Sequence, residues 1–404
     1  MFTKALKLTL LILALLASSV MPRAQGVGQY DLTFAQHGTQ NSVQEELNNG
    51  DSTWTWKRTD TASGERIEVR VVETVEFTED YADIKSIGQG GSIRIEETRG
   101  GETRRFEAWR DSAGQVQREY RVNHETRSMD ADGRAWLAKL LLQAVRRGGL
   151  DASARAGRML RRGGASAVLA EISQLEGDYV KRIYFGELIK NGQLTSGVLQ
   201  TVLRQAAHEL KSDYELAQLL IEAGTPLAGS DQALVALFEA SQSIKSDYER
   251  RRVLTAMAKK SLSRAAGAQL LKSLATISSD YEKATFLSEY STQFLTDAEL
   301  RAAYFQIVST IKSDYEHHRV LSSLLKNRGL SEATLREMLR SASAIQSDYE
   351  KASFLIESSS LFVESESLRP LFFNVVKTIQ SDYERTRVIS NLSRKHQIAF
   401  TSYR

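Results

Sequence analysis

The stretch Ile311-Lys312-Ser313-Asp314-Tyr315-Glu316 decides the fold of this chain, because copies of it recur throughout the second half. Seven copies share an Asp-Tyr pair, and six of them keep the whole Ser-Asp-Tyr-Glu core. The motif aspartates are Asp178, Asp213, Asp247, Asp280, Asp314, Asp348 and Asp382, at spacings of 35, 34, 33, 34, 34 and 34 residues. A fixed period of this length predicts a solenoid, in which stacked repeats bury a shared core.

Each motif also carries a helix start signal. In a capping box the Ser side chain accepts a hydrogen bond from the amide three residues on, and the Glu reaches back to the Ser amide. The Asp between them would be the first helical residue, where its charge suits the helix dipole. The predicted caps are Ser212 and Glu215, Ser246 and Glu249, Ser279 and Glu282, Ser313 and Glu316, Ser347 and Glu350, and Ser381 and Glu384.

Two further patterns follow each motif. Five and six residues after the Tyr stand apolar pairs such as Val320-Leu321, which is the spacing of a core stripe on an amphipathic helix. Three and four residues after the Tyr, basic pairs such as Arg251-Arg252 alternate with small pairs such as Ala284-Thr285. This second period of about 68 residues indicates a duplicated two-repeat unit.

The motif Tyr is the residue that capping leaves unexplained. One interpretation makes it a packing aromatic between repeats, with its hydroxyl on a backbone carbonyl. A second uses the longer period, which sets Tyr and Arg four residues apart for cation–π stacking. If that edge faces solvent, it forms a ridge suited to an acidic or extended partner; the alternative is a solvated face without a ligand. The candidate partner-binding residues are Tyr248, Arg252, Tyr315, Arg319, Tyr383 and Arg387.

The first third of the chain has a different pattern. Residues 65–77 and 91–99 alternate apolar and polar positions, and Gly100-Gly101 separates two such runs at hairpin distance. We expect an antiparallel β-meander or small sandwich of about six to eight strands at 25–130, with one apolar face and one rich in Arg and Glu. A helical connector and cap at 131–176 and the solenoid at 177–404 complete an α+β multidomain chain of about seven 34-residue helix-pair repeats.

Residues 1–24 resemble a signal peptide. Lys4 and Lys7 precede an apolar run at 8–17, which is too short to span a bilayer. Cleavage could follow Ser19 or Ala24, and an uncleaved anchor is the alternative. The expected location is extracytoplasmic, periplasmic or secreted, without a membrane span in the mature chain.

Composition excludes several kinds of chemistry. The chain has no Cys, so disulfides, thiol nucleophiles and Cys-rich metal sites are absent. Lys and Arg number 53 against 50 Asp and Glu, a balance that argues against nucleic-acid binding. No two of the six His stand three or four residues apart, and no phosphate-binding loop or nucleophile elbow is present. We therefore expect no metal site, no cofactor and no enzymatic activity.

Much of the chain resembles bacterial exported proteins in which Ser-Asp-Tyr-Glu repeats follow a β-rich segment. The resemblance rests on residues 83–107, 130–141 and 165–189 and on the six complete motifs. Such repeats occur as C-terminal extensions of membrane zinc metallopeptidases of the β-lactam-sensor type, and the resemblance implies an envelope location. The peptidase portion and its His-Glu-x-x-His motif are missing here, so protease activity does not carry over. The repeats are also HEAT-like and TPR-like, without the Trp-Leu-Gly-Tyr signature of tetratricopeptide repeats.

The sequence thus predicts a non-catalytic scaffold that presents a solenoid surface to a protein partner of unknown identity. The resemblance suggests a regulatory or sensor subunit of an envelope signalling system as one alternative. A carbohydrate-active α/α-toroid is another, because such barrels also consist of helix pairs. A purely structural spacer is the third, and the oligomeric state stays open.

Overall fold

The computed structural model describes residues 43–50, 52–227 and 230–396, so the predicted signal peptide at 1–24 lies outside the described residues. The chain divides into two compact units between Ala144 and Val145. An antiparallel sheet lies in the first unit and an all-α region forms the second, as the α+β prediction stated. The division falls within 131–176, the predicted connector, whose first helix belongs to the sheet unit.

The sheet unit is a meander rather than a sandwich. Seven strands form one antiparallel sheet in the order β1-β2-β3-β6-β7-β8-β9, and β4 pairs only with β5. The strands are β1 (Val43–Asn49), β2 (Thr53–Asp60), β3 (Glu65–Val72), β4 (Val75–Phe77), β5 (Ile84–Ile87), β6 (Ser92–Arg99), β7 (Glu102–Arg110), β8 (Val116–Val122) and β9 (Glu125–Arg127).

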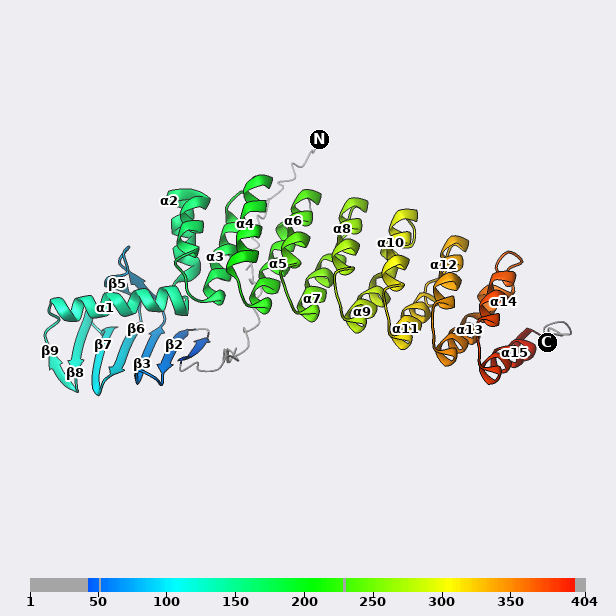
Figure 1. Ribbon diagram of the computed structural model, residues 1–404. Helices are drawn as coiled ribbons and strands as arrows, with labels where there is room; N and C mark the ends of the chain where they lie inside the picture. Colours follow the sequence, from blue (N-terminus) through cyan, green and yellow to red (C-terminus); the bar gives the residue numbers. More distant parts are fainter. Residues whose placement is uncertain (1–42, 51, 228–229, 397–404) are drawn as a thin grey trace, which may run out of the picture. The chain divides into compact units, whose positions relative to one another are not determined.

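The two faces of the sheet differ as the sequence alternation predicted. On β3, Ile67 and Val69 are buried while Glu68 and Arg70 are exposed, because successive side chains point to opposite faces. The solvated face carries ion pairs across neighbouring strands, among them Arg105 Nε to Glu96 at 2.7 Å. The apolar face must be covered, and helix α1 (Ala131–Gln143) lies across it (Figure 1).

One buried hydrogen bond fixes α1 on the sheet. The indole Nε1–H of Trp136 donates to the Glu97 carboxylate at 2.7 Å, and its ring lies 5.6 Å from the ring of Tyr120. Glu97 is only 7% exposed, and its second oxygen has no partner among the described residues. Because an uncompensated buried carboxylate is costly, the indole donor is a large part of what makes this position tolerable.

The second unit is a solenoid of alternating helices. The division falls within η1 (Ala144–Gly148), and α2 (Ala152–Ile172) is the first α-helix of the second unit. Seven helices begin at a motif Asp, as predicted: α3 (Asp178–Asn191), α5 (Asp213–Leu227), α7 (Asp247–Ala258), α9 (Asp280–Tyr290), α11 (Asp314–Leu324), α13 (Asp348–Val363) and α15 (Asp382–His396). The helices between them are α4 (Ser196–Glu209), α6 (Asp231–Ser241), α8 (Arg264–Leu274), α10 (Ala298–Val308), α12 (Glu332–Ser343) and α14 (Arg369–Lys377), with a 3₁₀ turn, η2 (Ser291–Gln293), after α9.

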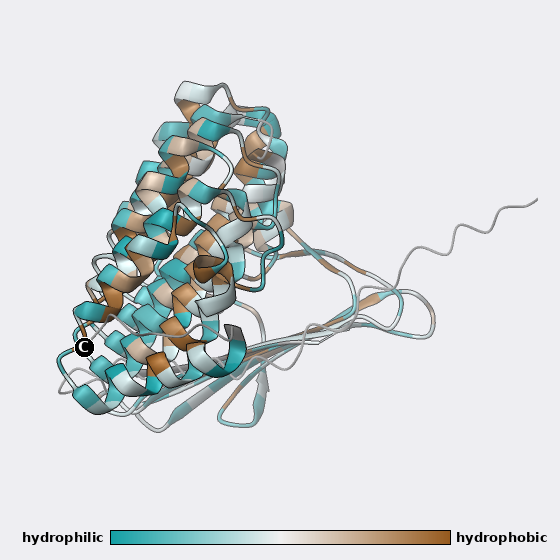
Figure 2. Cartoon of the chain, turned by 90° about the vertical axis from the view of Figure 1, so that its right-hand side faces the viewer, coloured by the Kyte–Doolittle hydropathy of each residue, from teal (hydrophilic) through white to brown (hydrophobic). Residues whose placement is uncertain are grey.

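The solenoid helices form two rows. Each motif helix packs on the next motif helix, and each intervening helix packs on the next intervening helix (Figure 1). The predicted core stripe is buried, with Phe286, Leu287, Val320 and Leu321 fully enclosed. Figure 2 shows hydrophobic and hydrophilic residues on the same helices, as amphipathic packing requires. In the part of the chain that the structure describes, no helix combines the length and apolar character needed to cross a membrane.

The Trp136–Glu97 contact predicts the behaviour of Trp136→Phe. Removing the indole donor leaves Glu97 buried without its partner, so the sheet unit should lose about 2 kcal/mol of unfolding free energy. All four Trp (Trp54, Trp56, Trp109 and Trp136) precede the solenoid, so the remaining tryptophan fluorescence reports on the sheet unit alone. Urea unfolding followed by fluorescence should shift, while helical circular dichroism at 222 nm should not. An unchanged fluorescence transition would show that the bond is unimportant.

Candidate functional site

The motif Ser caps its helix as predicted, but the Glu does not complete the capping box. In all six complete motifs the Ser hydroxyl oxygen accepts the amide N–H of the Glu at 3.3 Å. The Ser amide, which the Glu was expected to reach, donates instead to the Asp carboxylate of the preceding repeat. In the case of Ser313 that acceptor is Asp280, at 2.9 Å.

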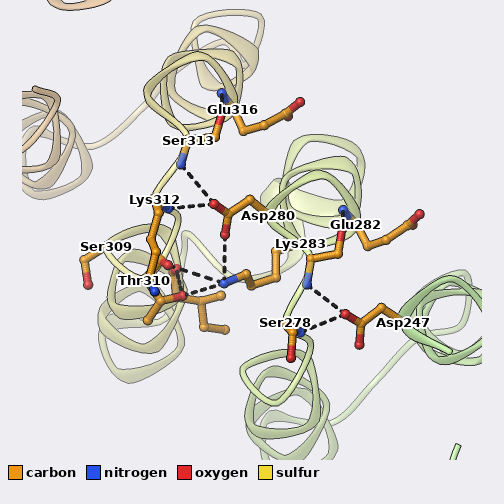
Figure 3. A network of polar contacts seen from close by, with 12 residues as sticks. Asp247, Ser278, Asp280, Glu282, Lys283, Ser309, Thr310, Lys312, Ser313 and Glu316 are labelled. Carbon is orange, nitrogen blue, oxygen red and sulfur yellow. Dashed lines mark hydrogen bonds and ion pairs between the residues drawn. The ribbon is translucent and has the colours of Figure 1, made fainter. Parts of the chain in front are cut away.

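This contact, which we call the Asp clasp, joins every motif to the next. The carboxylate of one motif accepts two successive backbone amides, those of the Ser and of the residue before it, in the following repeat. Figure 3 shows Asp280 reaching Lys312 and Ser313 in this way, and Asp247 reaching Ser278 and its neighbour. Six aspartates form the clasp at 2.6–3.1 Å: Asp178, Asp213, Asp247, Asp280, Asp314 and Asp348.

The clasp stabilises the ionised form of the Asp. Burial opposes ionisation of Asp280, but the amides of Ser313 and Lys312 and the ammonium of Lys283 outweigh it and hold the pKa of Asp280 below its ordinary value. The Nζ of Lys283 lies 3.3 Å from Asp280 and also donates to the Thr310 hydroxyl at 3.2 Å (Figure 3). The carboxylate is therefore a fixed charged acceptor for two helix-start amides.

The first and last motifs show that the Asp contacts the following repeat and not its own helix cap. In the first copy Gly177 and Val180 replace the Ser and the Glu, yet Asp178 is kept and clasps Lys211 and Ser212. That retention is the sequence signal for the clasp, and the capping interpretation overlooked it. In the last copy no further motif follows within the described residues, and the Asp382 side chain is 97% exposed.

The motif tyrosines form an exposed row, which we call the Tyr ladder. Its members are Tyr214, Tyr248, Tyr281, Tyr315, Tyr349 and Tyr383, with exposed fractions of 37, 52, 57, 61, 58 and 75%. Their hydroxyls have no hydrogen-bond partner within the described ranges. The packing interpretation, with the hydroxyl on a backbone carbonyl, therefore does not describe them. The edge does face solvent, which is the condition that the ridge hypothesis set.

The predicted Arg residues contact this ladder, but each reaches a different Tyr from the one expected. The guanidinium of Arg252 lies 5.6 Å from the ring centre of Tyr214, not over Tyr248. Arg319 lies 5.2 Å from Tyr281 in the same way. The third pair is Arg387 and Tyr349, at 5.0 Å, and Tyr383 has no such partner in the described chain. The stacking joins neighbouring repeats rather than residues of one helix.

The reason is that each of these guanidinium groups is held from both sides. Arg319 donates to Glu316 of its own motif at 2.6 Å and to the Thr285 hydroxyl of the preceding repeat at 3.1 Å. Arg252 donates in the same way to Glu249 and Gln218. Arg387 forms an ion pair with Glu384 and donates to the Ser353 hydroxyl. The uncharged polar residue four positions after the Tyr, which is Gln, Thr or Ser, thus receives the Arg of the next repeat.

The remaining interfaces use the residue three positions after the Tyr. Arg251 lies 5.4 Å from the Tyr248 ring of its own repeat and forms an ion pair with Glu282 of the next repeat. Arg182 likewise lies 5.4 Å from Tyr179 and reaches Glu215 of the next repeat, at 2.6 Å. The same arrangement results: a cation between the Tyr of one repeat and the Glu of the next, which we call the Tyr–Arg–Glu bridge.

This bridge explains the 68-residue period. A repeat with two basic residues supplies a cation to both of its neighbours. The residue three positions after the Tyr reaches the next repeat, and the residue four positions after the Tyr reaches the preceding repeat. The neighbours of such a repeat supply no cation and carry Ala and an uncharged polar residue, as in Ala284-Thr285. Along the described motif helices, each interface between consecutive repeats is spanned by one basic side chain from this position pair.

One interface departs from the rule. His318 stands where the other two forward bridges have Arg, and its Nδ1 lies 2.6 Å from Glu350 of the next repeat. The imidazole is shorter than an Arg side chain, and no stacking on Tyr315 results within the described part of the chain. The ring of Tyr315 is 61% exposed.

The carboxylates of the ridge are occupied by neighbouring groups. Each motif Asp before the last accepts backbone amides, and the Glu of each complete motif contacts a basic side chain. Burial raises the pKa of Glu215 more than its partner Arg182 lowers it, so this carboxylate is firmly enclosed. His317 is buried, its Nε2 lies 2.7 Å from the Ser341 hydroxyl, and burial lowers its pKa below the ordinary value. Among the described residues, no group of three or more potential ligands could hold a metal ion.

The clasp predicts a large effect of Asp280→Ala and a small effect of Asp382→Ala. The first change leaves the amides of Lys312 and Ser313 without their acceptor and should lower the unfolding free energy of the solenoid by about 2 kcal/mol. The matched change at the exposed Asp382 should cost less than about 0.5 kcal/mol. Urea unfolding at 222 nm measures both, and hydrogen exchange should accelerate around Ser313 only in the first variant. Equal costs for the two variants would contradict the clasp.

The bridge predicts that His318→Arg stabilises the solenoid. An Arg here can reach Glu350 and cover the Tyr315 ring, as Arg251 does at the corresponding position, for a gain of about 0.5–1 kcal/mol. The reciprocal change Arg251→His should cost a similar amount. Thermal unfolding of both variants beside the parent checks the pair. If the two changes shift stability in the same direction, the bridge is not the cause.

Compared with protein-family models, with curated proteins and with solved structures, the chain matches none of them. The resemblance to exported repeat proteins therefore stays an expectation.

Proposed function

We propose that this protein is a non-catalytic interaction scaffold that binds a protein partner along the Tyr ladder. One observation carries the proposal. In the described residues ten large apolar or aromatic side chains are exposed, and six of them are the ladder tyrosines, one from each complete motif. A row of exposed aromatic side chains on one set of helices is typical of an interaction site.

The ladder is held in place before any partner arrives. Asp clasps fix the backbone of each motif to the next, and the bridges limit the rotation of the rings that carry an Arg. Because little side-chain freedom is left to lose at those rings, binding there costs less conformational entropy than at mobile tyrosines. Tyr and Arg are also the residue types that dominate binding energy at protein interfaces.

The same contacts favour binding over catalysis. A general acid or base needs a carboxylate that is free to exchange a proton with substrate, whereas the motif carboxylates between repeats are engaged by amides or basic side chains. The arrangement of the helices also favours a scaffold over a toroid. Figure 1 places α3 and α15 at opposite ends of the solenoid unit, so the helix pairs form an open row.

The proposed place of action is extracytoplasmic. This rests on the sequence of residues 1–24, with Lys4 and Lys7 before an apolar run, and on the resemblance to exported repeat proteins.

Photocrosslinking in the native host tests the proposal. A benzophenone amino acid is placed at Tyr281 or at Tyr349, both more than half exposed, and at Val198 of α4 as the control. Val198 is 38% exposed but lies in the row of intervening helices rather than on a motif helix. We expect one and the same protein to be captured from both ladder positions and not from Val198.

Capture of the same species from all three positions, or of glycan from the ladder, would overturn the proposal. Circular dichroism of the three variants confirms that the solenoid is folded in each, so that a missing crosslink reports on binding.

A further inference from the structure

We infer that the segment bound by the ladder is a protein chain in the polyproline II conformation, with one residue in three facing successive tyrosines. This inference rests on the proposed function and names the conformation and chemistry of the partner. Three properties of the ladder carry it: the spacing of its rings, its free hydroxyls and the pairing of each bridging Arg with a motif Glu.

The spacing comes from helix packing. Neighbouring ladder tyrosines stand at the same place on adjacent motif helices, and packed helices lie about 8–10 Å apart. A polyproline II chain advances about 3.1 Å per residue with three residues per turn, so equivalent side chains recur about every 9.3 Å. A β-strand repeats on one face about every 6.7 Å or at twice that distance, and neither value matches.

The hydroxyls separate polyproline II from a helix. Tyr248, Tyr281, Tyr315 and the other ladder members present phenolic O–H donors that no described residue accepts. A helical partner uses its backbone carbonyls internally, whereas every carbonyl of a polyproline II chain is free to accept. The ladder therefore complements an extended chain with unsatisfied acceptors. Rows of aromatic rings are the surface that recognises proline-rich segments of this kind.

The charges favour an uncharged segment. Each bridging Arg is paired with a motif Glu, for example Arg319 with Glu316 and Arg387 with Glu384, so the cation is neutralised in the ridge itself. The ladder rings and their hydroxyls stay exposed beside these neutral pairs. Proline rings pack against such rings, and a stiff proline-rich chain loses little entropy on binding. An acidic partner, which the isolated basic pairs suggested, finds no unpaired bridging cation along the described ladder.

Fluorescence anisotropy with the full chain tests the inference. The probe is a fluorescein-labelled oligoproline of about 18 residues, long enough for six turns. A Gly-Ser peptide of equal length is the flexible control. We expect saturable binding of oligoproline alone, with affinity that falls when the probe is shortened to about nine residues, since fewer tyrosines are then covered.

Three variants assign the binding. Tyr281→Ala with Tyr315→Ala should weaken the affinity about tenfold or more, because two central rings are lost. Tyr281→Phe with Tyr315→Phe keeps the rings and should weaken it about three- to fivefold through the missing hydroxyls. Val198→Ala, on the other helix row, should leave the affinity unchanged. Circular dichroism verifies that each variant is folded.

The outcomes are distinct from those of the crosslinking experiment. No ladder-dependent binding of oligoproline overturns the inference, even if a protein is captured at Tyr281 and Tyr349. Binding of a linear oligosaccharide in place of oligoproline, abolished by the double Ala variant, overturns the inference and favours a glycan instead. Equal binding of the Gly-Ser peptide overturns the requirement for polyproline II.

Discussion

The solenoid depends on one recurring contact, in which an Asp carboxylate accepts two successive backbone amides from the next repeat. The amides at a helix start lack partners within the helix, and the clasp satisfies them across a repeat boundary. A contact of this kind fixes position as well as energy, because two donors on one carboxylate define both distance and direction. Asp280, which holds Lys312 and Ser313, therefore sets where α11 begins relative to α9.

The motif divides its work among four residues. Ser313 caps its own helix, Asp280 and its equivalents join repeats through the backbone, and Tyr281 and Glu316 hold a shared Arg between them. The Ser, Asp and Glu side chains are used up in capping the helix and in joining the repeats. Only the Tyr is both held and exposed, and for that reason the ridge rather than the carboxylates carries the proposed function.

In the proposed function, the regular spacing of the rings selects which partners fit. Neighbouring motif helices pack at a distance that side-chain volume determines, so the rings inherit a regular spacing that no single repeat could provide. A partner must match that spacing over several turns to gain from every ring. Such matching favours stiff, extended chains, whose own period is fixed, over flexible ones that lose more entropy on binding.

The sequence by itself determined the number and start of the motif helices, the buried stripe that includes Val320 and Leu321, and the two-faced sheet. These features are local, because capping and the alternation of apolar residues act within one element. Only the tertiary structure decided which partners the charged residues choose. Arg252 lies over Tyr214 rather than Tyr248, and the Ser313 amide donates to the Asp280 carboxylate rather than to that of Glu316. Those contacts join residues 38 and 33 positions apart. A distant partner that is already fixed by packing outcompetes a near one that must first be ordered.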